Sequence, residues 1–109
     1  METHEKLLAT IRERASQRIL FSQHGLRQIS RPTRLISTTD IRMVLEKGEV
    51  IEDYPEDARG HSCLILGKGT GGRPVHVLCS PKDDYLAVIT AYIPTEEEWR
   101  DDFRVRKKP

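Results

Sequence analysis

Cysteines and long apolar runs are scarce in this sequence of 109 residues, and each scarcity argues against a kind of site or segment. The two cysteines, Cys63 and Cys79, form no C-x-x-C pair, so no structural zinc site is expected within the chain. Both lie in apolar, strand-like runs, which favours small core residues over a redox pair. No apolar run approaches the roughly 20 residues that a membrane-spanning helix needs.

The composition of the chain and its first residues also bear on the cellular location and the broad class of the protein. The N-terminal residues lack the basic segment followed by an apolar one that is typical of a signal peptide, so we expect a cytoplasmic protein. A chain with 37% apolar and 32% charged residues is typical of one small, polar domain. No metal or nucleophile constellation is evident, and we expect no metal and no cofactor.

The net charge is only +1, yet the charges are unevenly distributed. Residues 12–34 include six arginines and one acidic residue, whereas residues 49–67 include five acidic residues and one arginine. An arginine patch can contact phosphates even in a nearly neutral protein. The alternative is an ordinary solvated helix face, and charge alone leaves both interpretations open.

The first half of the chain is predicted to be helical. Apolar residues recur at spacings of three and four over residues 5–20, which indicates an amphipathic helix. Ser22 is a candidate N-cap for a second helix that Pro32 should end. The cluster at 37–40 is typical of the start of a third helix, which Gly48 should stop.

The second half is predicted to form a sheet. Strand-forming residues are enriched in four runs, at 49–54, 62–68, 73–80 and 85–93. Short loops join the runs, so consecutive strands should pair as neighbours. The predicted fold is α+β, with N-terminal helices packed on a four-stranded, mainly antiparallel sheet. Within a single domain, 1–109, we expect a helical half at about 5–47, a sheet half at about 49–93, and a C-terminal helical turn with a basic tail at 95–109.

The segment Gly67–Gly72, GKGTGG, fits the pattern G-x-G-x-x-G that some dinucleotide sites contain. In such a site the last glycine opens a helix whose N-terminal amides bind the pyrophosphate. Here the sequence RPVHVL follows, which is typical of a strand. The glycines are therefore interpreted as a β-hairpin loop with positive φ angles rather than as a nucleotide site.

Several motifs resemble those of a family of small, mostly bacterial proteins described as a domain of unknown function. They are the Ser-x-His helix start at 22–24, the strand GEVIEDY at 48–54, the strand GRPVHV at 72–77 and the strand end ITAYIP at 89–94. Trp99, Phe103 and Arg106 resemble the family's C-terminal residues. The resemblance covers nearly the whole chain from about residue 7.

The family's fold is similar to that of the RelE/BrnT-type toxins of bacterial toxin–antitoxin pairs. The resemblance therefore implies a RelE/BrnT-like α+β fold and the function of a type II toxin, in one form a metal-independent endoribonuclease. It also implies an antitoxin partner, a small zinc-finger and DNA-binding protein, and RNA as the substrate. The lack of a long apolar run separately predicts no membrane association.

Metal-independent RNA cleavage needs a base, an acid and cations that offset the phosphate charge. His24 and His76 are the candidate base and acid, and Tyr92 is a candidate acid or orienting group. The candidate phosphate partners are Lys68, Arg73 and Arg106. Strand alternation takes His76 off the valine face of its strand, and it places Tyr92, with Leu86, Val88 and Thr90, on one face of the next strand. Thr90 and Tyr92 are therefore expected to lie beside His76.

Each candidate also has an ordinary structural interpretation. The histidines could cap or pack, the tyrosine could be a core-edge aromatic, and the basic side chains could simply be solvated. A second class of function follows, a non-catalytic binding module with a toxin-like fold that acts through a protein partner. The low net charge and the acidic segment 52–57 suit this alternative.

Overall fold

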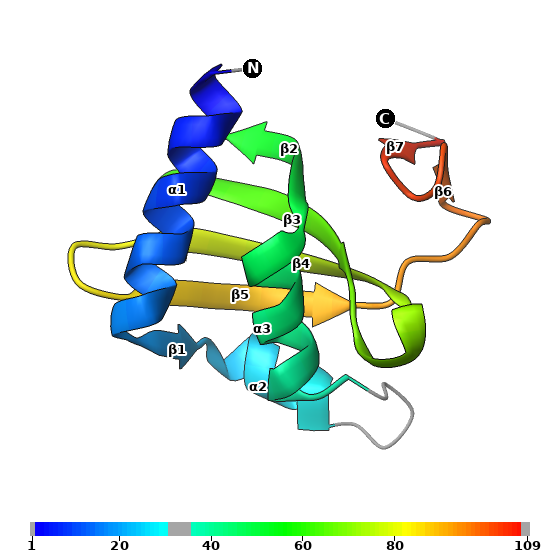
Figure 1. Cartoon of the computed structure of the whole chain (residues 1–109), viewed down its shortest axis with the longest axis horizontal. Helices are drawn as coiled ribbons and strands as arrows, with labels where there is room; N and C mark the ends of the chain where they lie inside the picture. Colours follow the sequence, from blue (N-terminus) through cyan, green and yellow to red (C-terminus); the bar gives the residue numbers. More distant parts are fainter. Residues whose placement is uncertain (1, 31–35, 108–109) are drawn as a thin grey trace.

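The computed structural model describes residues 2–30 and 36–107, which form helices on a five-stranded sheet and a small hairpin (Figure 1). The helices are α1 (Glu2–Gln17), α2 (Gln23–Ser30) and α3 (Thr38–Lys47), and a 3-10 turn, η1, spans Thr70–Gly72. The sheet strands are β1 (Ile19–Phe21), β2 (Glu49–Tyr54), β3 (Ser62–Lys68), β4 (Pro74–Pro81) and β5 (Leu86–Tyr92). The hairpin consists of β6 (Trp99–Arg100) and β7 (Val105–Arg106).

The sheet has the order β1-β5-β4-β3-β2. Pairs β2–β3, β3–β4 and β4–β5 are antiparallel, as predicted from the short loops that join them. The predicted number of strands was wrong, because residues 19–21 leave the first helix and pair in parallel with β5. Three consecutive apolar residues, two of them β-branched or aromatic, suit an edge strand better than a helix end. The predicted α+β class and the mainly antiparallel sheet are confirmed, with five strands in place of four.

Capping residues set the bounds of α2 and α3. The Ser22 hydroxyl accepts a hydrogen bond of 2.9 Å from the Gly25 amide, which confirms Ser22 as the N-cap of α2. Ser37 and Asp40 form a reciprocal capping box at the start of α3, and Gly48 follows its last residue. Pro32, predicted to end the second helix, lies outside the described residues.

The main core lies between the sheet and the helices α1 and α3, which cover one face of the sheet in Figure 1. Alternating residues of β4, including Val75 and Val77, are fully buried on this face. Cys63 and Cys79 pair in register across β3 and β4, and both are buried, free thiols. Their interpretation as small core residues is confirmed.

Arginines of α1 hold neighbouring elements in place. Arg12 donates from Nε to the Leu45 carbonyl oxygen at 3.0 Å and from Nη2 to that of Gly48 at 3.2 Å. It thereby satisfies carbonyls at the C-terminus of α3, where a positive charge is also favoured by the helix dipole. Arg14 donates to the Lys82 carbonyl oxygen at 2.6 Å. These two members of the predicted arginine patch therefore have structural hydrogen bonds.

The glycine segment forms the β3–β4 hairpin loop. Lys68 ends β3 and Pro74 begins β4, with the Gly69 amide donating to the Arg73 carbonyl oxygen at 2.8 Å. Gly71 and Gly72 have φ angles of 73° and 79°, a region that favours glycine. The hairpin interpretation is confirmed, because Thr70–Gly72 form only a three-residue turn and the strand β4 follows it.

The C-terminal segment differs from the predicted helical turn and tail. Thr95 accepts from the Trp99 amide at 3.0 Å, which makes one turn, and the chain then continues into the β6–β7 hairpin. Positions 108 and 109 of the predicted tail lie outside the described residues. In the described part of the chain, no helix combines the length and apolar character needed to cross a membrane.

Candidate functional site

His76 lies on the sheet face that α1 and α3 leave uncovered. Its β4 neighbours Val75 and Val77 point into the helix-covered core, so alternation sends the imidazole to the opposite face. In the sheet it pairs with Leu66 on one side and Tyr92 on the other. The side chain is nevertheless fully buried, with 0% exposure, because the C-terminal segment covers this second face.

Both ring nitrogens of His76 have hydrogen-bond partners. Nδ1 lies 3.1 Å from the Tyr92 hydroxyl oxygen, and Nε2 lies 2.9 Å from the Phe103 carbonyl oxygen. The Trp99 ring packs edge-on against the imidazole, with centroids 4.4 Å apart. Burial lowers the pKa of His76 to about 4, so the ring is neutral at pH 7.

An unusual backbone turn brings the Phe103 carbonyl to His76. Asp101, Asp102 and Phe103 all have positive φ angles, of 54°, 56° and 69°, which are uncommon for residues other than glycine. The Arg104 amide closes the turn on the Arg100 carbonyl oxygen at 3.0 Å. The strand pairing of β6 and β7 on either side holds the turn in this conformation.

Arg106 fastens the hairpin to β2 and to Trp99. Its Nε and Nη2 donate to the two carboxylate oxygens of Glu52 at 2.8 and 3.1 Å, a bidentate arrangement. The guanidinium carbon lies 4.7 Å from the centre of the Trp99 ring, in cation–π geometry. Hydrogen bonding to Glu52, whose other partner is Tyr54, raises the pKa of Arg106 above its ordinary value. About half of the Arg106 side chain, 47%, stays exposed.

A β-bulge in β5 determines which of its side chains lie on the same face of the sheet as His76. The register slips between Leu78 and Cys79 on β4, so that Cys79 pairs with Val88 whereas Leu78 pairs with Thr90. Val88 therefore stays in the helix-covered core, and Thr90 moves to the other face with Tyr92. The prediction that Thr90 and Tyr92 lie on the His76 face is confirmed, whereas the predicted sharing of that face with Val88 was wrong.

The carbonyl of the bulged residue also anchors α2. The Ser22 hydroxyl donates to the Ile89 carbonyl oxygen at 2.7 Å. A Cβ atom on Gly25 would lie 3.1 Å from the Val88 oxygen and 3.2 Å from that of Ile89, so glycine permits the close approach. This contact places His24, at the start of α2, beside the end of β5.

These elements enclose an open groove of about 790 Å³. It is lined by His24, Thr90, Tyr92, Ile93, Thr95, Glu97, Glu98, Trp99, Arg106 and Lys107. Three of the predicted site residues, His24, Tyr92 and Arg106, therefore line one surface. Sequence reasoning missed Glu97, Glu98 and Lys107, because it assigned them to a helical turn and a solvated tail.

The other three predicted residues lie elsewhere. His76 is behind Tyr92, and neither Lys68 nor Arg73 is among the lining residues. Lys68 is exposed at the end of β3. Arg73 donates to the buried Asp40 carboxylate at 3.1 Å, beside the start of α3. The two cations that flank the glycine loop are thus separated from the groove in the structure.

Asp40 is the centre of that second polar cluster. Its Oδ1 accepts from the Thr70 amide at 2.7 Å and from the Thr70 hydroxyl at 2.6 Å. Burial alone would raise the pKa of Asp40, but hydrogen bonds from Thr70 and Ser37 outweigh burial and lower it to about 2. The carboxylate ties the glycine loop to the start of α3, which is a structural role.

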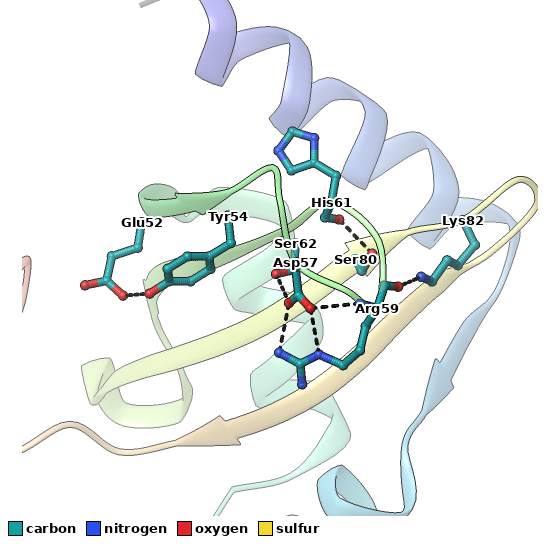
Figure 2. A network of polar contacts seen from close by, with 8 residues as sticks. All are labelled: Glu52, Tyr54, Asp57, Arg59, His61, Ser62, Ser80 and Lys82. Atoms are coloured by element: carbon teal, nitrogen blue, oxygen red, sulfur yellow. Dashed lines mark hydrogen bonds and ion pairs between the residues drawn. The ribbon is translucent and has the colours of Figure 1, made fainter.

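The acidic segment between β2 and β3 is held by internal contacts (Figure 2). Asp57 accepts from the Arg59 side chain at 3.0 and 2.8 Å and from the Ser62 hydroxyl at 2.6 Å. The Ser80 hydroxyl donates to the His61 carbonyl oxygen at 2.7 Å, and the Lys82 ammonium group donates to that of Arg59. These bonds hold the loop against the end of β4. The Asp57 carboxylate of the acidic segment therefore already has hydrogen-bond partners within the chain.

No group of three His, Cys, Asp or Glu residues that could hold a metal ion occurs within residues 2–30 and 36–107. The groove offers a histidine, a phenol, hydroxyls, two cations and two carboxylates as its chemical groups. Such a set can bind a polar ligand and move a proton at one position.

Comparison with known proteins identifies one family. The model of a family described as a domain of unknown function (DUF4258) matches residues 21–93, which span α2, α3 and the strands β2 to β5. No curated protein and no solved structure matches the chain significantly.

Proposed function

From the premise that this chain belongs to the DUF4258 family, we propose that it is a metal-independent endoribonuclease whose groove binds single-stranded RNA. The observation that carries the proposal is the convergence of His24, Tyr92 and Arg106 on one groove from three separate parts of the chain. The histidine can serve as the base and the cation can offset the phosphate charge, and the phenol adds a hydrogen-bonding group for the ligand.

His24 is the proposed general base. It is exposed at the N-terminal end of α2 and lines the groove, whereas His76 is fully buried. His24 would take the proton of the attacking 2′-hydroxyl as the 2′-oxygen bonds to phosphorus. The 5′-oxygen would leave with a proton from water in the open groove.

Arg106 and Lys107 would offset the negative charge that develops on the phosphate. Arg106 is already oriented by Glu52 and Trp99, so its position is set before a ligand binds. Glu97 and Glu98 also line the groove, with the Lys107 amide donating to the Glu98 carbonyl oxygen at 2.9 Å, and their negative charges oppose non-specific binding of long polyanions. The resemblance to RelE/BrnT-type toxins was inferred from sequence motifs alone, and on that basis we propose a role as the toxin of a type II pair, with a small zinc-finger and DNA-binding antitoxin as its partner.

The decisive assay uses purified protein, a labelled single-stranded RNA and EDTA. Cleavage should persist in EDTA and leave a 2′,3′-cyclic phosphate, and a 2′-deoxy nucleotide at the cleaved position should stop it. His24→Ala should lower the rate about 10²- to 10⁴-fold. His61→Ala is the matched control, because His61 lies outside the groove on the loop before β3.

Melting curves of both variants must match that of the wild type, since an unfolded enzyme is also inactive. Induced expression of the wild type without its partner should arrest bacterial growth. Folded protein that neither cuts RNA nor arrests growth would reject the nuclease proposal.

One observation favours the second candidate function, a non-catalytic binding module. His76, the other candidate proton-transfer group, is fully buried and has both nitrogens bonded, so the groove has one imidazole instead of two. A groove of this kind could bind a protein partner without chemistry. Stable binding of a partner that covers the groove, without RNA cleavage, would support this candidate.

A further inference from the structure

The hydrogen bonds around His76 have a fixed direction. A peptide oxygen carries no proton, so the 2.9 Å contact between Phe103 and Nε2 requires the hydrogen of the imidazole to be on Nε2. The ring is enclosed by Trp99 and Tyr92 and has no exposed surface. Its environment favours the neutral form, which has only one N–H group.

The other ring nitrogen must then be an acceptor. Nδ1 lies 3.1 Å from the Tyr92 hydroxyl oxygen, so the phenol donates its single proton to Nδ1. Tyr92 has no second proton to offer to the groove that it lines. The phenol oxygen keeps only its lone pairs for a further partner.

We infer that Tyr92 acts in the groove only as a hydrogen-bond acceptor, oriented by His76, and that it selects donor groups of the bound RNA over phosphate oxygens. This inference rests on the proposed function. Two donors of RNA fit, the 2′-hydroxyl of a nucleotide next to the cleaved bond and an amino group of a base. The attacking 2′-hydroxyl itself is excluded, because its proton goes to His24.

Tyr92 and His76 have separate roles. Tyr92 touches the ligand and sets which groups are accepted, and His76 is a positioning residue that acts through Tyr92. A proton relay from Tyr92 to His76 is disfavoured, because it would create a charged imidazolium in a fully buried site. Tyr92 is correspondingly a poor general acid, since burial raises its pKa to about 12.

The first test measures the imidazole directly. Nitrogen-15 NMR of the full chain at pH 7 should show hydrogen on Nε2 of His76 and none on Nδ1. Tyr92→Phe should shift the Nδ1 resonance by removing its donor, and Tyr85→Phe should leave it unchanged, because Tyr85 precedes the opposite end of β5. A protonated Nδ1 in the wild type would overturn the inference even if the protein binds RNA.

The second test measures binding of three adenine octanucleotides by fluorescence anisotropy. One is ordinary RNA, one carries 2′-fluoro groups, and one carries N6,N6-dimethyladenine, with each checked on a gel for cleavage after the titration. Removing the RNA group that donates to the Tyr92 oxygen should weaken binding about 2- to 12-fold, the range for one net hydrogen bond. The affected oligonucleotide identifies the sugar or the base as the source.

The variants make the result specific to Tyr92. Tyr92→Phe should weaken the binding of ordinary RNA by a similar factor, so that ordinary RNA and the affected analogue bind equally well. Tyr85→Phe should keep the wild-type affinity for ordinary RNA and the wild-type difference between the two oligonucleotides. If the wild type binds all three equally well, the inference fails and the groove remains an RNA site. If it binds none of them, the proposed function fails and the inference falls with it.

Discussion

Acidification should destabilise this protein through His76 before its carboxylates are protonated. The pKa of His76 is about 4 in the folded chain, against an ordinary value of 6.5, because burial disfavours the charged ring. As the pH falls, the unfolded chain therefore binds the proton first, and stability is lost between about pH 6.5 and 4. The full effect is about 3 kcal/mol, of which about 2 kcal/mol should be lost between pH 7 and pH 5.

Urea denaturation at pH 7 and pH 5 measures this loss. His76→Gln should remove most of the pH dependence in this window, although it will be less stable than the wild type at pH 7. His4→Gln, in the first turn of α1, is the matched control and should keep the wild-type dependence. An NMR titration of His76 in the wild type checks the same quantity if the variant fails to fold. A wild type equally stable at both pH values would refute the argument from burial.

Three further predictions concern other parts of the fold. Gly25→Ala should cost about 1–3 kcal/mol in urea denaturation, because the added methyl group crowds backbone oxygens of β5 that are 3.1 and 3.2 Å away. Asp40→Asn should cost about 3 kcal/mol by the same measurement, since it leaves a buried polar cluster without its charge, and the exposed Asp83→Asn should cost little. The thiols of Cys63 and Cys79 should react with a disulfide reagent only when urea unfolds the chain, because both are buried, and the hydrogen bond between Cys79 and Cys63 together with burial raises the pKa of Cys79. Rapid reaction of the native protein would contradict this.

Much of the fold could be predicted because its boundaries are encoded locally. Ser22 and the capping box at 37–40 mark two helix starts by side chains that bond to nearby amides. The four long strands coincide with predicted runs to within about a residue, as expected where alternation and turn residues agree. None of these signals depends on contacts between distant parts of the chain.

The errors arise where distant contacts decide the outcome. Residues 19–21 become a strand because β5 offers a free edge, a partner that is about 65 residues away in sequence. The bulge at Ile89 has no glycine or proline to indicate it, and its carbonyl is bound by Ser22 from α2. Strand alternation alone therefore placed Tyr92 correctly beside His76 but also placed Val88 on the same face.

The candidate site depends on the segment that sequence reasoning described least well. Strand alternation predicts that the His76 side chain lies on the face of β4 opposite Val75 and Val77. Whether that face is exposed to solvent depends on residues 95–107, which come more than fifteen positions later in the sequence. Those residues fold back only because three non-glycine residues adopt left-handed conformations and because Arg106 pairs with Glu52 across the sheet. Neither feature follows from local propensity. The same covering that removes His76 from the groove supplies the Phe103 carbonyl, which fixes the hydrogen of His76 on Nε2 and leaves Nδ1 to accept from Tyr92. In the proposed site the buried histidine therefore acts through Tyr92 without touching the ligand.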